Sequence, residues 1–189
     1  MGFKKGLALP ELLIGLAITA GIGIIILAIY ISQYKLFNKQ SSLIDVATQN
    51  KLALDEMVKT IRESQSLVTS CCSSETTSSE ELVLQIWPLN ASGEPTDPTS
   101  GYDYIIYKRD PNNNTKLLRK IVPTPGSTRP ASEKIIAVNI GTDSGDINFN
   151  YGADPAAASQ IDITLKTTQT ILGQTQSTTH TATAVLRNK

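Results

Sequence analysis

The first part of the chain is continuously apolar. Residues 7–31 read LALPELLIGLAITAGIGIIILAIYI and include one charged residue, Glu11. As an α-helix rising about 1.5 Å per residue, this stretch spans about 37 Å, whereas the hydrocarbon core of a bilayer is about 30 Å thick. It is too long for the apolar part of a cleaved secretory signal and lacks a good small-residue cleavage site at its end. The pattern predicts a membrane-spanning helix over residues 7–32.

The pattern becomes amphipathic over residues 33–68, which contain neither Pro nor Gly. Apolar residues recur there at spacings of three, four and seven, as on one helical face: Phe37, Ile44, Ala47, Leu54, Met57, Val58, Ile61 and Val68. A coiled coil is the alternative interpretation, but Lys51 and Gln65 interrupt its second apolar series. We expect this helix to pack on a globular head.

After Glu80 the apolar residues recur at every second position, which is typical of β-strands. Clusters of Pro, Gly and Asn separate these stretches and indicate turns. The predicted strands cover residues 82–87, 104–107, 117–122, 134–140, 146–151, 160–171 and 175–186, the last two as a long hairpin. The hydroxyl-rich residues 69–79 are predicted to be a loop. The fold class is α+β, a long N-terminal helix packed on an antiparallel β-rich head. The chain is thus divided into a short basic segment at residues 1–6, the membrane-spanning helix at 7–32, the amphipathic helix at 33–68 and the β-rich head at 69–189.

Composition narrows the function classes. The chain has 189 residues, with 17 basic and 17 acidic side chains and one His. This neutral balance gives no support for nucleic acid as a partner, because phosphate binding needs a basic surplus. No Walker loop, dinucleotide-binding glycine motif, nucleophile elbow or HExxH motif occurs. We therefore expect no enzymatic activity and no cofactor.

Glu11 requires a partner if it lies at apolar depth, where a carboxylate costs about 2.5–3.5 kcal/mol. Cleavage after Gly6 would place a new α-ammonium group on Leu7, four residues away and on the same helical face. The two charges could pair within one chain or between neighbouring chains, where exclusion of water strengthens their attraction. This pairing predicts that Glu11 favours assembly.

The segment KKGLALPELLIGLAI resembles a type III (prepilin) signal of the type IV pilin-like family. The resemblance implies that Lys4 and Lys5 belong to a basic leader, that prepilin peptidase cuts after Gly6, and that Leu7 is N-methylated. It also implies that Glu11 is the assembly carboxylate. Leu7 replaces the usual Phe, and Pro10 replaces the usual aliphatic residue. After cleavage Pro10 lies in the first helical turn, where its missing N–H costs little.

Residues 80–188 resemble W/J-type minor pilins and J-type pseudopilins, in YIIYKRD, EKIIAVNIGTDSGDINFNY and the final AVLRN. The resemblance implies a subunit near the tip of a pilus-like or type II secretion filament. Its implied partners are other pilins or pseudopilins, the peptidase, membrane lipid and the inner-membrane assembly platform. Its implied location is the bacterial cytoplasmic membrane in a single pass with the head outside, and then a periplasmic or extracellular filament. The alternative is a membrane-anchored extracellular binding module that does not polymerise.

Two further groups in the head have local chemistry. Cys71 and Cys72 could form a vicinal disulfide, remain thiols or bond to another chain. Asp143 and Asp146, in GTDSGD, could offer oxygen ligands to calcium, or they could cap a turn. The spacing is shorter than a full calcium-binding loop, so we expect no metal site.

Overall fold

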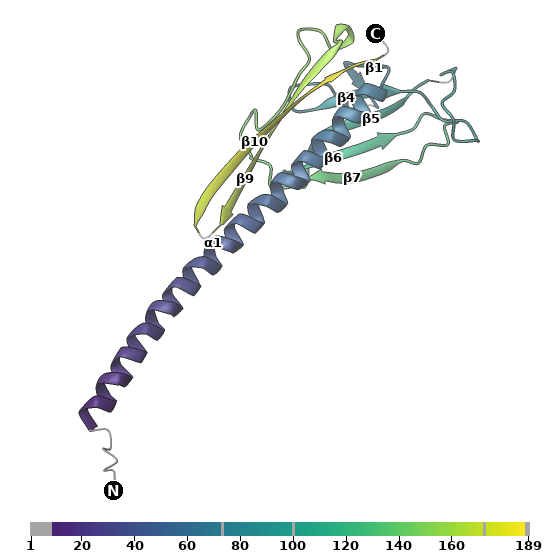
Figure 1. Ribbon diagram of the computed structural model, residues 1–189. Helices are drawn as coiled ribbons and strands as arrows, with labels where there is room; N and C mark the ends of the chain where they lie inside the picture. Colours follow the sequence, from purple (N-terminus) through teal and green to yellow (C-terminus); the bar gives the residue numbers. More distant parts are fainter. Residues whose placement is uncertain (1–8, 73, 100, 172, 188–189) are drawn as a thin grey trace. The chain divides into compact units, whose positions relative to one another are not determined.

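The α+β fold class is confirmed by the computed structural model, which describes residues 9–72, 74–99, 101–171 and 173–187 (Figure 1). One helix, α1 (Leu9–Glu63), precedes a set of antiparallel strands. The chain divides into two compact units, with the boundary between Ser42 and Leu43 within α1. Lys4 and Lys5 of the predicted leader, and Gly6 and Leu7 at the predicted cleavage site, lie outside the described residues.

Within the first unit the described chain is entirely helical, from Leu9 to Ser42. Pro10 lies in the first described turn of α1. The helix continues without interruption through Gly15, Gly21 and Gly23. The predicted membrane-spanning stretch is therefore regular helix over all of its described residues.

The second unit uses one face of residues 43–63 of α1. The buried residues on that face are Val46, Asn50, Ala53, Leu54, Met57 and Ile61. The predicted stripe is therefore correct for Leu54, Met57 and Ile61, whereas Ile44 is 64% exposed.

The predicted C-terminal end of the helix at residue 68 is wrong, because α1 ends at Glu63. Ser64 donates from both its backbone N–H and its hydroxyl to the carbonyl oxygen of Ile61, which closes the last turn. The next residues form β1 (Ser66–Leu67), which pairs with β4 and buries Leu67 in the sheet. Backbone hydrogen bonds to a sheet edge thus end a helical pattern that no Pro or Gly interrupts.

The strands of the described residues form two sheets and one small hairpin. The five-stranded sheet has the order β1-β4-β5-β6-β7, with β4 (Leu82–Ile86), β5 (Asp103–Asp110), β6 (Asn113–Val122) and β7 (Ser132–Ala137). The three-stranded sheet has the order β10-β9-β8, with β8 (Ile147–Asn150), β9 (Gln160–Ile171) and β10 (Gln174–Val185). The predicted loop at residues 69–79 contains the hairpin β2 (Ser70–Cys71) and β3 (Glu75–Thr76), so that prediction was incomplete.

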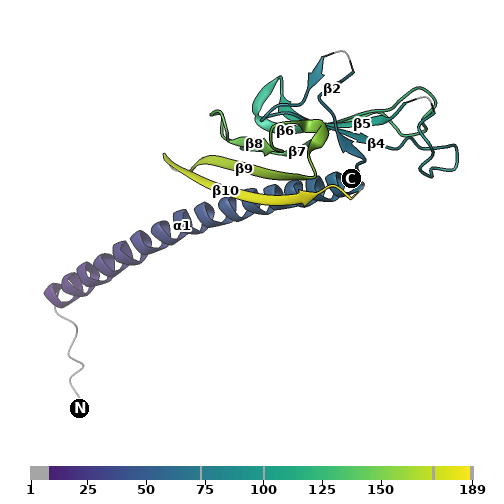
Figure 2. The same cartoon turned by 90° about the horizontal axis from the view of Figure 1, so that it is seen from above.

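A single core joins residues 43–63 of α1 to both sheets. Met57 and Ile61 are fully buried with Leu84 of β4 and Ile161 of β9 in one cluster. In Figure 2 the end of α1 lies beside the strands that this cluster joins. The other face of the five-stranded sheet buries a second set of aliphatic residues, Val83, Ile106 and Leu118. This second face is where the β2–β3 hairpin is fixed.

Candidate functional site

The most exposed apolar surface of the chain lies on α1. Its apolar segment, which we define as residues 9–31, has no buried side chain. Large aliphatic side chains are exposed on every side of this segment; Leu9 is 76% exposed, Leu16 67% and Ile24 69%. By length and composition α1 can cross a membrane. Such a surface needs lipid or other apolar helices around it.

Glu11 is the acidic residue in the first described turn of α1. Its predicted partner, the α-ammonium of Leu7, lies outside the described residues, as do Gly6, Lys4 and Lys5. An acid in a first turn is also favoured by the positive end of the helix dipole. The structure therefore places the carboxylate at the N-terminal end of the apolar segment, and the proposed pairing stays a prediction.

The three glycines of the apolar segment are not required by contacts within the described chain. A methyl group built on Gly15, Gly21 or Gly23 meets no atom within 4 Å. Gly costs about 1 kcal/mol relative to Ala in a helix interior. Small residues such as these allow another helix to approach closely in a membrane.

The two cysteines lie at the turn of the β2–β3 hairpin. Cys71 and Cys72 are joined as a vicinal disulfide, with Cα atoms 3.8 Å apart. Cys72 has a φ of 52°, which is uncommon for a residue with a side chain. Pairing of Ser70 with Thr76 and of Cys71 with Glu75 closes the hairpin. The disulfide therefore lies at the end of β2, next to the paired residues of the hairpin.

Glu75 fixes this hairpin to the sheet, and we call its contacts the Glu75 clamp. Its carboxylate accepts hydrogen bonds from the Nζ of Lys108 at 2.6 Å and from that of Lys120 at 2.8 Å. The Glu75 side chain is only 5% exposed. The lysines come from the adjacent strands β5 and β6. One carboxylate thus links the disulfide hairpin to two strands of the second sheet face.

The acid–base behaviour of the clamp follows from burial and charge. Burial raises the pKa of Glu75, but the hydrogen bonds from Lys108 and Lys120 outweigh it and lower the pKa from 4.5 to about 2. Burial, followed by the nearby Glu75 carboxylate, raises the pKa of Glu81. The clamp therefore holds one carboxylate ionised and makes ionisation of its neighbour less favourable. Sequence reasoning did not identify this cluster.

Asp143 and Asp146 are part of a polar network centred on Arg109. The Asp146 carboxylate lies 2.9 Å from the Nζ of Lys166 and accepts from the backbone N–H of Asp143 at 3.0 Å. Arg109 donates to the carbonyl oxygens of Gly141 and Asp143 and to the carboxylate of Glu80. Burial raises the pKa of Asp146, but the Lys166 hydrogen bond and the Asp143 N–H lower it overall. Asp146 thus has a structural role, because its carboxylate forms an ion pair with the ammonium group of Lys166.

Metal ligation has little support in this network. Within residues 9–72, 74–99, 101–171 and 173–187, no three His, Cys, Asp or Glu residues form a group that could hold a metal ion. Calcium normally takes six to eight oxygen ligands. Asp143 and Asp146 do share a turn, as the alternative interpretation of GTDSGD expected, since Asp146 N–H donates to Asp143 O at 3.2 Å.

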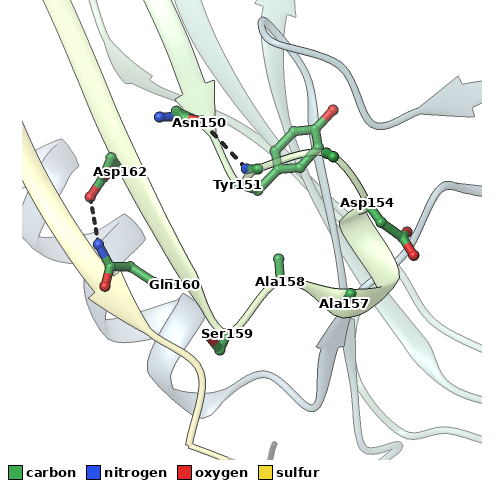
Figure 3. A pocket seen from close by; sticks show the side chains of 10 residues that line it. Asn150, Tyr151, Asp154, Ala157, Ala158, Ser159, Gln160 and Asp162 are labelled. Atoms are coloured by element: carbon green, nitrogen blue, oxygen red, sulfur yellow. Dashed lines mark hydrogen bonds between the residues drawn. The ribbon is translucent and has the colours of Figure 1, made fainter.

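A pocket lies where β8, the 3₁₀ turn η1 (Pro155–Ala157) and the start of β9 meet (Figure 3). Its acidic side chains already have local partners. Asp154 accepts from the backbone N–H of Ala156 and caps η1, and Asp162 accepts from Gln160 and Thr183. These bonds explain the acids as elements of turn and strand structure.

Comparison of this chain with protein family models, with curated proteins and with solved structures found no match.

Proposed function

We propose that this chain is a minor pilin or pseudopilin. It is a non-enzymatic subunit that is cleaved after Gly6, held in the bacterial cytoplasmic membrane and then assembled near the tip of a pilus-like or secretion filament. The observation that carries the proposal is an apolar segment of exposed side chains with an acid in its first described turn. Lys4, Lys5 and Gly6, which resemble a basic leader that ends in glycine, precede this segment in the sequence. A β-rich second unit after the helix supports the same proposal.

The physical mechanism is exchange of lipid for protein around the apolar segment. Full burial of an aliphatic side chain contributes about 1.5–3 kcal/mol. A subunit leaving the membrane must retain that contribution by packing its exposed Leu and Ile side chains against other apolar helices. Glu11 then selects the position of a neighbour, because a carboxylate at apolar depth is stabilised by a positively charged chain end.

The first experiment is mass spectrometry of the native chain, purified from membranes and digested so that its N-terminal peptide is recovered. We expect a peptide that begins at Leu7 and carries one added methyl group. A functional native chain that retains residues 1–6 contradicts the proposal, because it lacks the α-ammonium group at Leu7.

The second experiment separates a filament subunit from a membrane-anchored binding module that does not polymerise. Glu11→Leu should leave membrane insertion unchanged or improved and should abolish cross-linking to other filament subunits. Thr19→Leu is the matched control, because it also places Leu in the exposed apolar segment. Cross-linking of Glu11→Leu at the wild-type level contradicts the assembly role, and absence of any cross-linking in the wild type supports the binding module.

A further inference from the structure

A groove of about 670 Å³ lies in the second unit, lined by the last turns of α1 and by the five-stranded sheet. This size falls in the range of sites that bind small molecules or short peptide segments. Its apolar lining comes from the ends of three neighbouring strands and the following residue: Ile86, Trp87, Ile105 and Ile121. Trp87 is 37% exposed. A ligand with an aliphatic side chain would therefore find an apolar surface there.

The charged lining of this groove is predominantly basic. Lys59 and Arg62 come from α1, and three arginines come from β6 and the later part of the chain: Arg119, Arg129 and Arg187. The acidic lining residues are Glu56 and Glu63. The groove thus has an excess of positive charge in a chain that is neutral as a whole. A local excess of positive charge attracts negatively charged ligands.

Internal ion pairs fix part of this basic lining in position. Arg119 donates to the carboxylate of Glu56. Arg129 donates to the fully buried carboxylate of Asp103 at 2.8 Å and to the backbone carbonyl of Trp87 at 3.1 Å. Side chains held in this way lose little conformational freedom when a ligand binds. The lining is therefore partly preorganised.

The other basic side chains of the groove are available to a ligand. Arg62 and Arg187 are both exposed, and neither has an ion pair among the described residues. Lys59 lies 4.0 Å from Glu63 in an exposed pair, which has little energetic weight. An anionic ligand could therefore contact these groups without breaking a buried interaction.

We infer that this groove binds an acidic peptide segment of a partner protein, in which carboxylates flank an aliphatic side chain. The apolar lining packs against the aliphatic side chain, and the arginines donate hydrogen bonds to the carboxylates, whose planar geometry matches a guanidinium group. A free inorganic anion would leave the apolar lining unused. The inference concerns the second unit and does not depend on cleavage or assembly of the apolar segment.

Trp87 is the single tryptophan of the chain, so its fluorescence reports directly on this groove. The full chain in neutral-lipid nanodiscs would be titrated with acetyl-LELDL-amide and with the uncharged acetyl-LQLNL-amide. We expect a saturable change in Trp87 fluorescence with the acidic peptide. The uncharged peptide should bind at least about tenfold more weakly. Equal affinities, or the absence of a saturable change, overturn the inference.

Variants locate the binding. Arg62→Gln combined with Arg187→Gln should weaken the acidic peptide about tenfold, because each lost exposed charge contact contributes up to about 1 kcal/mol. Lys51→Gln combined with Lys134→Gln removes the same charge from exposed positions outside the groove and should leave affinity unchanged. If both double variants weaken binding of the acidic peptide equally, the assignment of the binding site to this groove is wrong. Tighter binding of oligogalacturonate or single-stranded DNA than of the acidic peptide overturns the ligand class.

Discussion

Replacement of Glu75 by Gln removes the charge that holds the disulfide hairpin on the sheet. The carboxylate contacts two ammonium groups, at 2.6 and 2.8 Å, and is 5% exposed. A pKa lowered from 4.5 to about 2 corresponds to about 3 kcal/mol of folding free energy when the group is fully ionised. The raised pKa of Glu81 opposes this contribution at neutral pH. We expect Glu75→Gln to lower the free energy of unfolding by about 2–3 kcal/mol at pH 7.

The sign of the pH dependence follows from the lowered pKa. The contribution of Glu75 is fully present above pH 4.5, the value for the unfolded chain, and is lost as pH falls through about 2. Glu81 acts in the opposite direction, because its raised pKa makes ionisation at higher pH destabilising. Gln does not titrate, so the wild-type and variant stabilities should converge as the pH approaches 2.

Urea unfolding of the full chain in detergent, followed by Trp87 fluorescence, measures this difference from pH 7 down to pH 2. Glu94→Gln removes a carboxylate from an exposed loop and serves as the matched control. Equal unfolding free energies for wild type and Glu75→Gln at pH 7, or a constant difference down to pH 2, would refute the role of the clamp.

Three further predictions concern buried groups. Gly141→Ala places a methyl group on the Asp146 carboxylate, whereas Gly23→Ala meets nothing within 4 Å; urea unfolding should show a loss of about 1–3 kcal/mol for the first and none for the second. Asn50 is fully buried, and neither amide atom has a partner among the described residues, so Asn50→Leu should increase the unfolding free energy by about 1–2 kcal/mol. Burial raises the pKa of Tyr107 to about 12, so ultraviolet titration should show that Tyr107→Phe loses a phenolate signal with a midpoint near pH 12.

Elements with a long and regular pattern were predictable from the sequence. β9 has the predicted bounds Gln160–Ile171, because Ile161, Ile163 and Leu165 alternate with polar residues and are all buried. β10 follows it in an antiparallel hairpin, and the turn at Gly173 has a φ of 78° that glycine accepts readily. In β9 the apolar residues of the alternating pattern are the ones that face the core, so the pattern in the sequence reports burial directly.

The β2–β3 hairpin and its clamp were not predictable for a physical reason. Each strand has two residues, which is too short to show a period. Glu75 lies 33 residues from Lys108 and 45 from Lys120, so no local spacing connects them. The end of α1 was missed on similar grounds, since the partner that ends the helix is a strand 19 residues further on.

The two units satisfy their charged and apolar groups in different ways. In the second unit the buried carboxylates have cationic partners within the chain, as Glu75 has Lys108 and Asp103 has Arg129. In the first unit the apolar side chains of residues 9–31 remain exposed. Internal pairs contribute to folding, whereas an exposed apolar helix contributes free energy only when lipid or another chain covers it. Substitutions in the Glu75 and Asp103 pairs should therefore change unfolding free energy, while substitutions at residues 9–31 should change membrane association or assembly and leave unfolding of the second unit unchanged.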